Sequence, residues 1–241
     1  MKFWLGPMRV YLVTGTKNVQ AVLRSSGHLS PDRLAFMVLP TIDNVTPEDL
    51  LMFKADKSGR GHIPLDGTPG KDRMWATNHR IILDNLSSQA ATTTIGAKYC
   101  ELLMTKFEEQ QKDKWQTIQI FQYIKQEITE AAIISLAGKS ILELNPGFID
   151  AMWSFDRLFY PLLLGIPKFI YSAPYRARDA FHKMGTKWLE YAFANYDNNG
   201  PDLDWDKIWG TRYVRKHATF FKEKGFNQTS RSGLALASIW A

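Results

Sequence analysis

From residue 88 onward the chain repeats apolar side chains at the period of an α-helix, and this pattern limits the possible folds more than any other feature. Side chains three or four residues apart share one face of a helix. Two such stripes contain Ile95, Tyr99, Leu102, Leu103 and Phe107, and then Ile118, Phe121, Ile124, Ile128, Ala131 and Ile134. Breaks at Asn145-Pro146-Gly147, at Gly165-Ile166-Pro167 and at residues 198–202 predict loops. Further helices are expected near residues 148–164, 175–195, 205–224 and 232–241.

The beginning of the chain has a different pattern. Residues 3–14 mix β-branched and aromatic side chains around a Gly-Pro pair, which predicts a short hairpin. A threonine at position 16 can cap a helix that runs to about Arg24. Residues 25–72 are rich in turn signals, and a helix is expected from about Asp72 to Asn85. We therefore predict a mainly α fold with a small N-terminal β piece. The length allows one large domain or two small ones. Residues 1–72 contain the hairpin, short helix and loops, and residues 73–241 form the helical region.

The composition excludes several classes of protein. The formal net charge of +6 is mild and spread over 241 residues, so no nucleic-acid partner is predicted. No run approaches the roughly 20 apolar residues of a membrane span, and no signal peptide is recognisable. We therefore expect this chain to be cytosolic or peripheral to a membrane. The single cysteine, Cys100, excludes an internal disulfide. Its position on a helical stripe predicts a buried packing residue.

Motifs of the common catalytic sites are not found in the sequence. Gly59-x-Gly61 and Gly70-Lys71 lack the further residues that a dinucleotide-binding or phosphate-binding loop requires. The five histidines do not have metal-ligand spacing, and no G-x-S-x-G motif occurs. The residues alone therefore indicate a helical protein without an assigned reaction.

The last ten residues, 232–241, are apolar and carry no helix cap. A helix that ends a domain usually satisfies its last carbonyl groups with a glycine or asparagine cap, or with basic side chains. We therefore expect the chain to be cut within a helix, so that the chemistry of a longer parent protein lies beyond Ala241.

One segment resembles a known family. Residues 155–167 read F-D-R-L-F-Y-P-L-L-L-G-I-P, and Ala177-Arg178 follow about ten residues later. This pattern resembles the cytochrome P-450 heme-thiolate monooxygenases, in the branch of the sterol 7-alpha-hydroxylases, prostacyclin synthase and their fungal relatives. Other matches to the family are Phe3-Trp4-Leu5-Gly6, Val10-Tyr11-Leu12-Val13, Gly61-His62, Asp66-Gly67 and Ile239-Trp240-Ala241. The resemblance covers nearly the whole chain. It implies the N-terminal half of the family's fold, ending at the start of the central long helix.

This resemblance implies a heme b cofactor, with electrons from NADPH delivered through an NADPH-cytochrome reductase. The family's axial cysteine lies in F-x-x-G-x-x-x-C-x-G, where its thiolate favours cleavage of the O–O bond. Around Cys100 only Gly96 fits that motif, because Thr93 and Leu102 stand at the other fixed positions. The family's E-x-x-R pair does not occur either. We therefore expect the chain alone to be inactive, with no catalytic residue and no metal ligand of its own.

The resemblance also implies contacts to heme and substrate. Many family members use W-x-x-x-R to bind a heme propionate, since an indole N–H and a guanidinium both donate to a carboxylate. Here Trp75 is followed by His79 at the arginine position and then by Arg80, which makes these three the candidate cofactor contacts. The alternative is that Trp75 packs and that His79 and Arg80 are solvated. Residues expected to border the substrate are Leu65, Pro161, Leu164, Leu236 and Trp240, each of which could otherwise be core.

Two functions remain open from the sequence. The first is a fragment of a heme-dependent monooxygenase that oxidises a lipophilic substrate such as a sterol, fatty acid or terpenoid. Its parent family sits on the endoplasmic reticulum membrane. In this chain, membrane-surface contact is expected from residues 158–175, where Phe169 and Ile170 lie beside basic residues. The second is a non-catalytic helical protein that binds a membrane surface or another protein.

Overall fold

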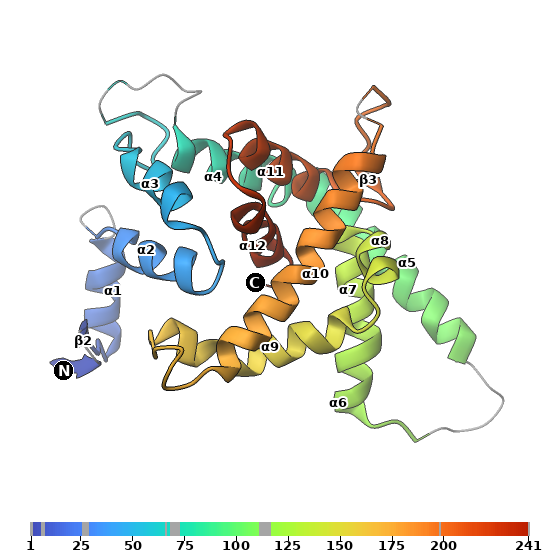
Figure 1. The fold of residues 1–241 in the computed structure, drawn as a ribbon, viewed down its shortest axis with the longest axis horizontal. Helices are drawn as coiled ribbons and strands as arrows, with labels where there is room; N and C mark the ends of the chain where they lie inside the picture. Colours follow the sequence, from blue (N-terminus) through green and yellow to red (C-terminus); the bar gives the residue numbers. More distant parts are fainter. Residues whose placement is uncertain are drawn as a thin grey trace.

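A computed structural model describes residues 2–5, 8–25, 29–65, 67, 73–110, 117–197 and 199–240 of the chain (Figure 1). Strand β1 (Lys2–Leu5) pairs antiparallel with β2 (Met8–Tyr11), with Leu5 opposite Met8. Helix α1 (Thr16–Arg24) follows. The predicted hairpin and short helix are therefore confirmed. The Gly-Pro turn at residues 6 and 7, Asp66, Asp72 and Ala241 lie outside the described residues.

The prediction of a loop-rich segment at residues 25–72 is wrong for much of its length, because two helices lie there. They are α2 (Asp32–Thr41) and α3 (Pro47–Ala55). The Thr46 hydroxyl accepts from the Asp49 N–H at the start of α3, and Pro47 occupies the first helical position. Both features favour helix initiation. Leu39 of α2 and Phe53 of α3 are buried, so the two helices belong to the core.

The middle of the chain is helical, as the apolar stripes predict. Its elements are α4 (Met74–Asn85), α5 (Gln89–Gln110), α6 (Ile120–Tyr123), the π-helical turn η3 (Ile124–Ile128), α7 (Thr129–Ala137) and α8 (Ser140–Leu144). Cys100 lies on α5 as expected, but its side chain is exposed, which corrects the prediction of a buried packing residue. No helix in the described part of the chain is long and apolar enough to cross a membrane.

The main core lies between three long helices (Figure 1). Helices α9 (Phe148–Leu163) and α10 (Ala173–Asn195) pack against each other, and α12 (Gln228–Trp240) packs against α10. The core includes the fully buried side chains of Phe148, Phe155, Leu162, Phe181, Trp188 and Leu236. Burial of such aromatic and aliphatic groups is the main source of stability in a helical protein.

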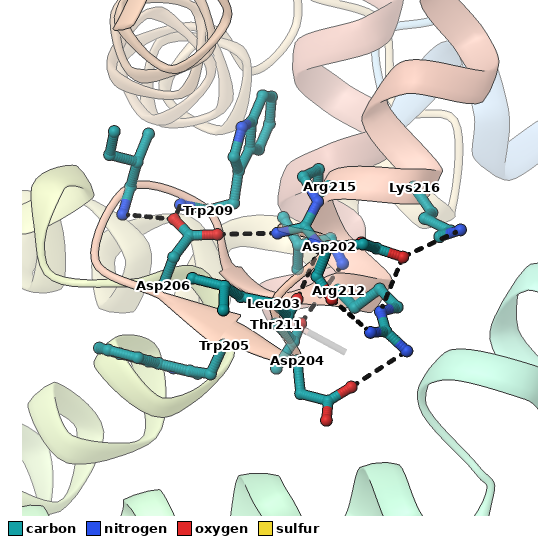
Figure 2. Close-up of polar contacts among 12 residues, drawn as sticks. Asp202, Leu203, Asp204, Trp205, Asp206, Trp209, Thr211, Arg212, Arg215 and Lys216 are labelled. Atoms are coloured by element: carbon teal, nitrogen blue, oxygen red, sulfur yellow. Dashed lines mark hydrogen bonds and ion pairs between the residues drawn. The ribbon is translucent and has the colours of Figure 1, made fainter. Parts of the chain in front are cut away.

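The helix predicted at residues 205–224 is shorter in the structure, because α11 begins at Arg212 (Arg212–Glu223). The residues before it form a small hairpin in which β3 (Trp205–Asp206) pairs with β4 (Gly210–Thr211). Figure 2 shows the polar contacts that hold it. Asp206 accepts two backbone N–H groups at the tip of the hairpin and also bonds the buried Arg215 guanidinium at 2.8 Å. Arg215 bonds Asp202 as well, so α11 anchors the hairpin from its own first turns.

Candidate functional site

A buried arginine joins the start of α4 to the loop that follows α3. The Arg73 guanidinium donates to the carbonyl oxygens of Gly61 at 2.5 Å and His62 at 2.8 Å, and to the Ser58 hydroxyl at 3.2 Å. The Asp56 carboxylate in turn accepts from Ser58 and from the Trp75 backbone N–H. Burial alone would raise the pKa of Asp56, but these hydrogen bonds and the nearby Arg73 charge hold that pKa below its usual value. Sequence reasoning missed Arg73. The Asp-x-Ser turn at residues 56–58 was the available signal.

Trp75, a candidate cofactor contact, is half-buried in this framework. Its indole Nε1 donates to the Phe53 carbonyl at 3.1 Å. Its ring packs against Phe53, with 4.8 Å between the ring centroids, and the Arg60 guanidinium lies 3.7 Å above the ring. Trp75 therefore fixes α4 to α3, and its N–H already has a partner.

The other two candidate cofactor contacts lie one turn further along α4. His79 and Arg80 are both exposed. The Arg80 Nη2 atom lies 3.4 Å from His62 Nδ1, so Arg80 and His62 share one surface. An exposed guanidinium beside imidazole groups suits the binding of a carboxylate, because it offers fixed donors and positive charge.

The candidate substrate residues fall into three places. Leu65 is 82% exposed in the loop between α3 and α4. Pro161 and Leu164 lie at the C-terminal end of α9, where Pro161 is partly buried and Leu164 is exposed. In the view of Figure 1, α2 lies between that loop and the end of α9. The loop that carries Leu65 therefore lies apart from the end of α9 in this view.

Leu236 and Trp240 form the third place, on α12. Leu236 is buried, and a Cβ atom at Gly185 of α10 would lie only 2.6 Å from its Cδ1. The Trp240 indole donates to Asp156 Oδ1 at 3.1 Å, and its ring packs against Phe155 and Phe159 at centroid distances of 5.2 and 5.1 Å. Trp240 thus connects α12 to the helix that carries Pro161.

Two ionisable residues that sequence reasoning missed lie beside Leu236 and Trp240. Asp43 and His182 line one narrow gap with these side chains and with Phe155. Burial raises the pKa of Asp43 to about 7. Burial, followed by the positive charge of Arg178, lowers the pKa of His182 to about 4, and Asp179 opposes this shift. Near pH 6 both groups are therefore uncharged in the folded chain.

The relatives of this chain are fungal proteins. It is 32% identical over 245 residues to "Cytochrome P450 monooxygenase calL" of Penicillium decumbens, an alignment that covers 100% of this chain and 46% of that protein. It is 30% identical over 122 residues to "Cytochrome P450 monooxygenase fsoE" of Humicola fuscoatra, covering 49% of this chain and 21% of the relative. The chain therefore spans less than half the length of these curated relatives. No family profile and no solved structure matches it.

Proposed function

The chain is thus a relative of the fungal cytochrome P450 monooxygenases, and we propose that it forms the N-terminal half of a heme-dependent monooxygenase that oxidises a lipophilic substrate such as a sterol, fatty acid or terpenoid. The observation that carries the proposal is the alignment of the whole chain with less than half of one relative. The helical fold with a small antiparallel sheet agrees with a truncated fold of that family.

In this proposal, His79 and Arg80 contact a heme propionate. Both are exposed, and the Arg80 guanidinium next to His62 fits a carboxylate. Trp75 supports the site by anchoring α4, because its indole N–H is already bonded to the Phe53 carbonyl. Heme held here and ligated by a cysteine thiolate would supply the oxygen chemistry of the family. Cys100 lies within the long helix α5. We therefore assign the thiolate to the part of the parent protein that follows this chain, and the electrons to NADPH and its reductase.

The substrate would lie along the apolar surface that α9 and α12 share. Leu236, Trp240 and Phe159 supply aliphatic and aromatic contacts, and Pro161 and Leu164 extend the same surface to the end of α9. Such a lining suits a lipophilic molecule, since ligand sites are mostly apolar with few polar groups. Leu65, which lies apart, would reach the substrate only through movement of its loop.

A membrane contact is proposed for the segment between α9 and α10. Phe169 is 88% exposed and Ile170 is 67% exposed, with Lys168 and Arg176 exposed nearby. Apolar side chains beside basic ones favour the surface of an anionic bilayer. This segment would hold the parent enzyme against the endoplasmic reticulum membrane. The same exposed segment is the observation that favours the alternative, a non-catalytic protein of the membrane surface.

The proposal can be tested by joining the chain to the C-terminal part of the Penicillium relative. The joined protein should bind heme and give the absorption band of thiolate-ligated ferrous heme with carbon monoxide, whereas the 241-residue chain alone should not. Replacing both His79 and Arg80 with alanine should lower heme retention during gel filtration, and Arg24→Ala on α1 serves as the control. A folded chimera without the band, or the band from the chain alone, would contradict the proposal.

A further inference from the structure

Asp43 and His182 are buried polar residues with unusual hydrogen bonding in the described part of the chain. Their exposed fractions are 8% and 5%. The His182 Nδ1 atom has no partner within the described part of the chain, and no hydrogen bond to the Asp43 carboxyl group occurs there either. Most buried polar groups in proteins have at least one partner, so the fully buried His182 Nδ1, beside an Asp43 side chain that also has none in this part of the chain, requires an explanation.

The backbone holds both residues in place. A Cβ atom at Gly233 of α12 would lie 2.6 Å from the Asp43 carbonyl carbon, so the two backbones are in direct contact. The Ser230 hydroxyl accepts from the Thr46 N–H at 2.9 Å, three residues after Asp43. On α10, the His182 carbonyl accepts from the Ser232 hydroxyl at 2.9 Å. Neither residue can therefore move far to find a partner within the chain.

Apart from the pair itself, the gap has an apolar lining. The gap is lined by Ile42, Phe155, Phe181, Leu236, Ala237 and Trp240, and it is too narrow to hold a water molecule. Among the aromatic residues of this lining, Trp240 is partly buried, whereas Phe155 and Phe181 are fully buried. Movement of the Trp240 ring would open the gap, at the cost of its hydrogen bond to Asp156 and its packing against Phe155 and Phe159.

We propose that Asp43 and His182 bind a hydroxyl group of an otherwise apolar molecule, which enters when the Trp240 ring moves aside. A hydroxyl both donates and accepts, and so do a protonated carboxyl group and a neutral imidazole. The hydrocarbon body would then lie against Phe155 and Leu236, on the proposed substrate surface. This inference rests on the proposed function and narrows its substrate class to hydroxylated lipophiles.

Two molecules with the same carbon skeleton test the pair: farnesol, which has a hydroxyl group, and farnesene, which does not. Tryptophan fluorescence of the 241-residue chain without heme should show farnesol binding at least about tenfold more tightly than farnesene. Asp43→Val combined with His182→Phe should abolish this preference. Lys183→Gln, which changes an exposed charge on the same helix as His182, should keep it.

A second measurement does not depend on any variant. Farnesol should shift the ring nitrogen NMR signals of His182, while those of His217, which is buried elsewhere against Phe221, stay unchanged. Equal affinity for the two molecules, no binding of either, or an unshifted His182 ring would each overturn the inference. None of these outcomes affects the carbon monoxide band of the joined protein, so failure of the proposed function remains distinguishable.

Discussion

The close contact between α12 and the segment after α2 leaves no room for a side chain at Gly233. A Cβ atom at this position would lie 2.6 Å from the Asp43 carbonyl carbon and nearer still to its oxygen, whereas ordinary contact begins at 3.4 Å. In a Gly233→Ala variant the two backbones must therefore separate by more than 0.8 Å. Both partners are backbone, so no side-chain rotation can relieve the clash.

The loss of stability can be estimated from the hydrogen bonds that this separation disturbs. Three hydrogen bonds fasten the segment to α12: Thr46 N–H to Ser230 Oγ at 2.9 Å, Asn227 N–H to Asp49 Oδ2 at 3.1 Å, and Asn227 Nδ2 to Thr46 Oγ1 at 2.7 Å. Each contributes about 1 kcal/mol, and overpacking a core costs about 1–3 kcal/mol more. The higher helix propensity of alanine offsets about 1 kcal/mol of this loss of stability. We therefore expect Gly233→Ala to lower the free energy of unfolding by about 3–5 kcal/mol.

The measurement is urea unfolding of the chain, followed by circular dichroism. Gly96→Ala is the matched control, because Gly96 also lies inside a helix, α5, but a Cβ atom there would meet nothing within 4 Å. That variant should be more stable than the original chain by about 1 kcal/mol. If Gly233→Ala is as stable as Gly96→Ala, the packing of α12 on Asp43 described above is wrong.

Two further predictions concern pH and membrane binding. Burial lowers the pKa of His217 from 6.5 to about 4. Between these two pH values the unfolded chain binds a proton at this residue and the folded chain does not. The free energy of unfolding therefore decreases as the pH falls from 6.5 to about 4. In urea unfolding, His217→Phe should make this pH dependence of the free energy of unfolding less steep by about 1.4 kcal/mol per pH unit. Asp43→Asn should make the decline steeper, because the raised pKa of Asp43 stabilises the folded chain at low pH. Replacing both Phe169 and Ile170 with aspartate should reduce co-sedimentation with anionic vesicles. Leu51→Asp, an exposed position on α3, should not, and equal losses would refute a membrane contact at residues 169–170.

The sequence predicted the elements whose apolar residues recur at helical spacing and failed where that spacing is missing. Helix α3 has four consecutive apolar residues, 50–53, which make no stripe, and only its Thr46-Pro47 start marked it. The hairpin before α11 was missed for another reason. Its strands have two residues each, and Asp206 is held by Arg215 from the following helix. Contacts of this kind depend on the assembled fold, so local patterns cannot reveal them.

In the candidate site, too, local patterns predicted some residues, and others depend on the assembled fold. Trp75, His79 and Arg80 could be named because four-residue spacing places the first two on one face of a helix. That the Trp75 indole N–H bonds the Phe53 carbonyl depends on how α3 packs, which no motif encodes. Asp43 and His182 are far apart in the sequence, and neither lies in a recognisable pattern. Only their shared burial in the structure distinguishes them from ordinary polar residues.

The packing of α12 and the proposed hydroxyl site depend on the same backbone. Asp43 lines the gap while its carbonyl rests on Gly233, and Arg178 donates to the nearby Thr41 carbonyl at 2.9 Å. A side chain added at position 233 would push Asp43 away from α12, because the nearest atoms that it meets are backbone atoms of Asp43. The preference for farnesol over farnesene should therefore fall in Gly233→Ala even at temperatures where that variant is fully folded, and it should persist in Gly96→Ala. A variant that is destabilised but keeps the preference would show that Asp43 is not one of the hydroxyl's partners.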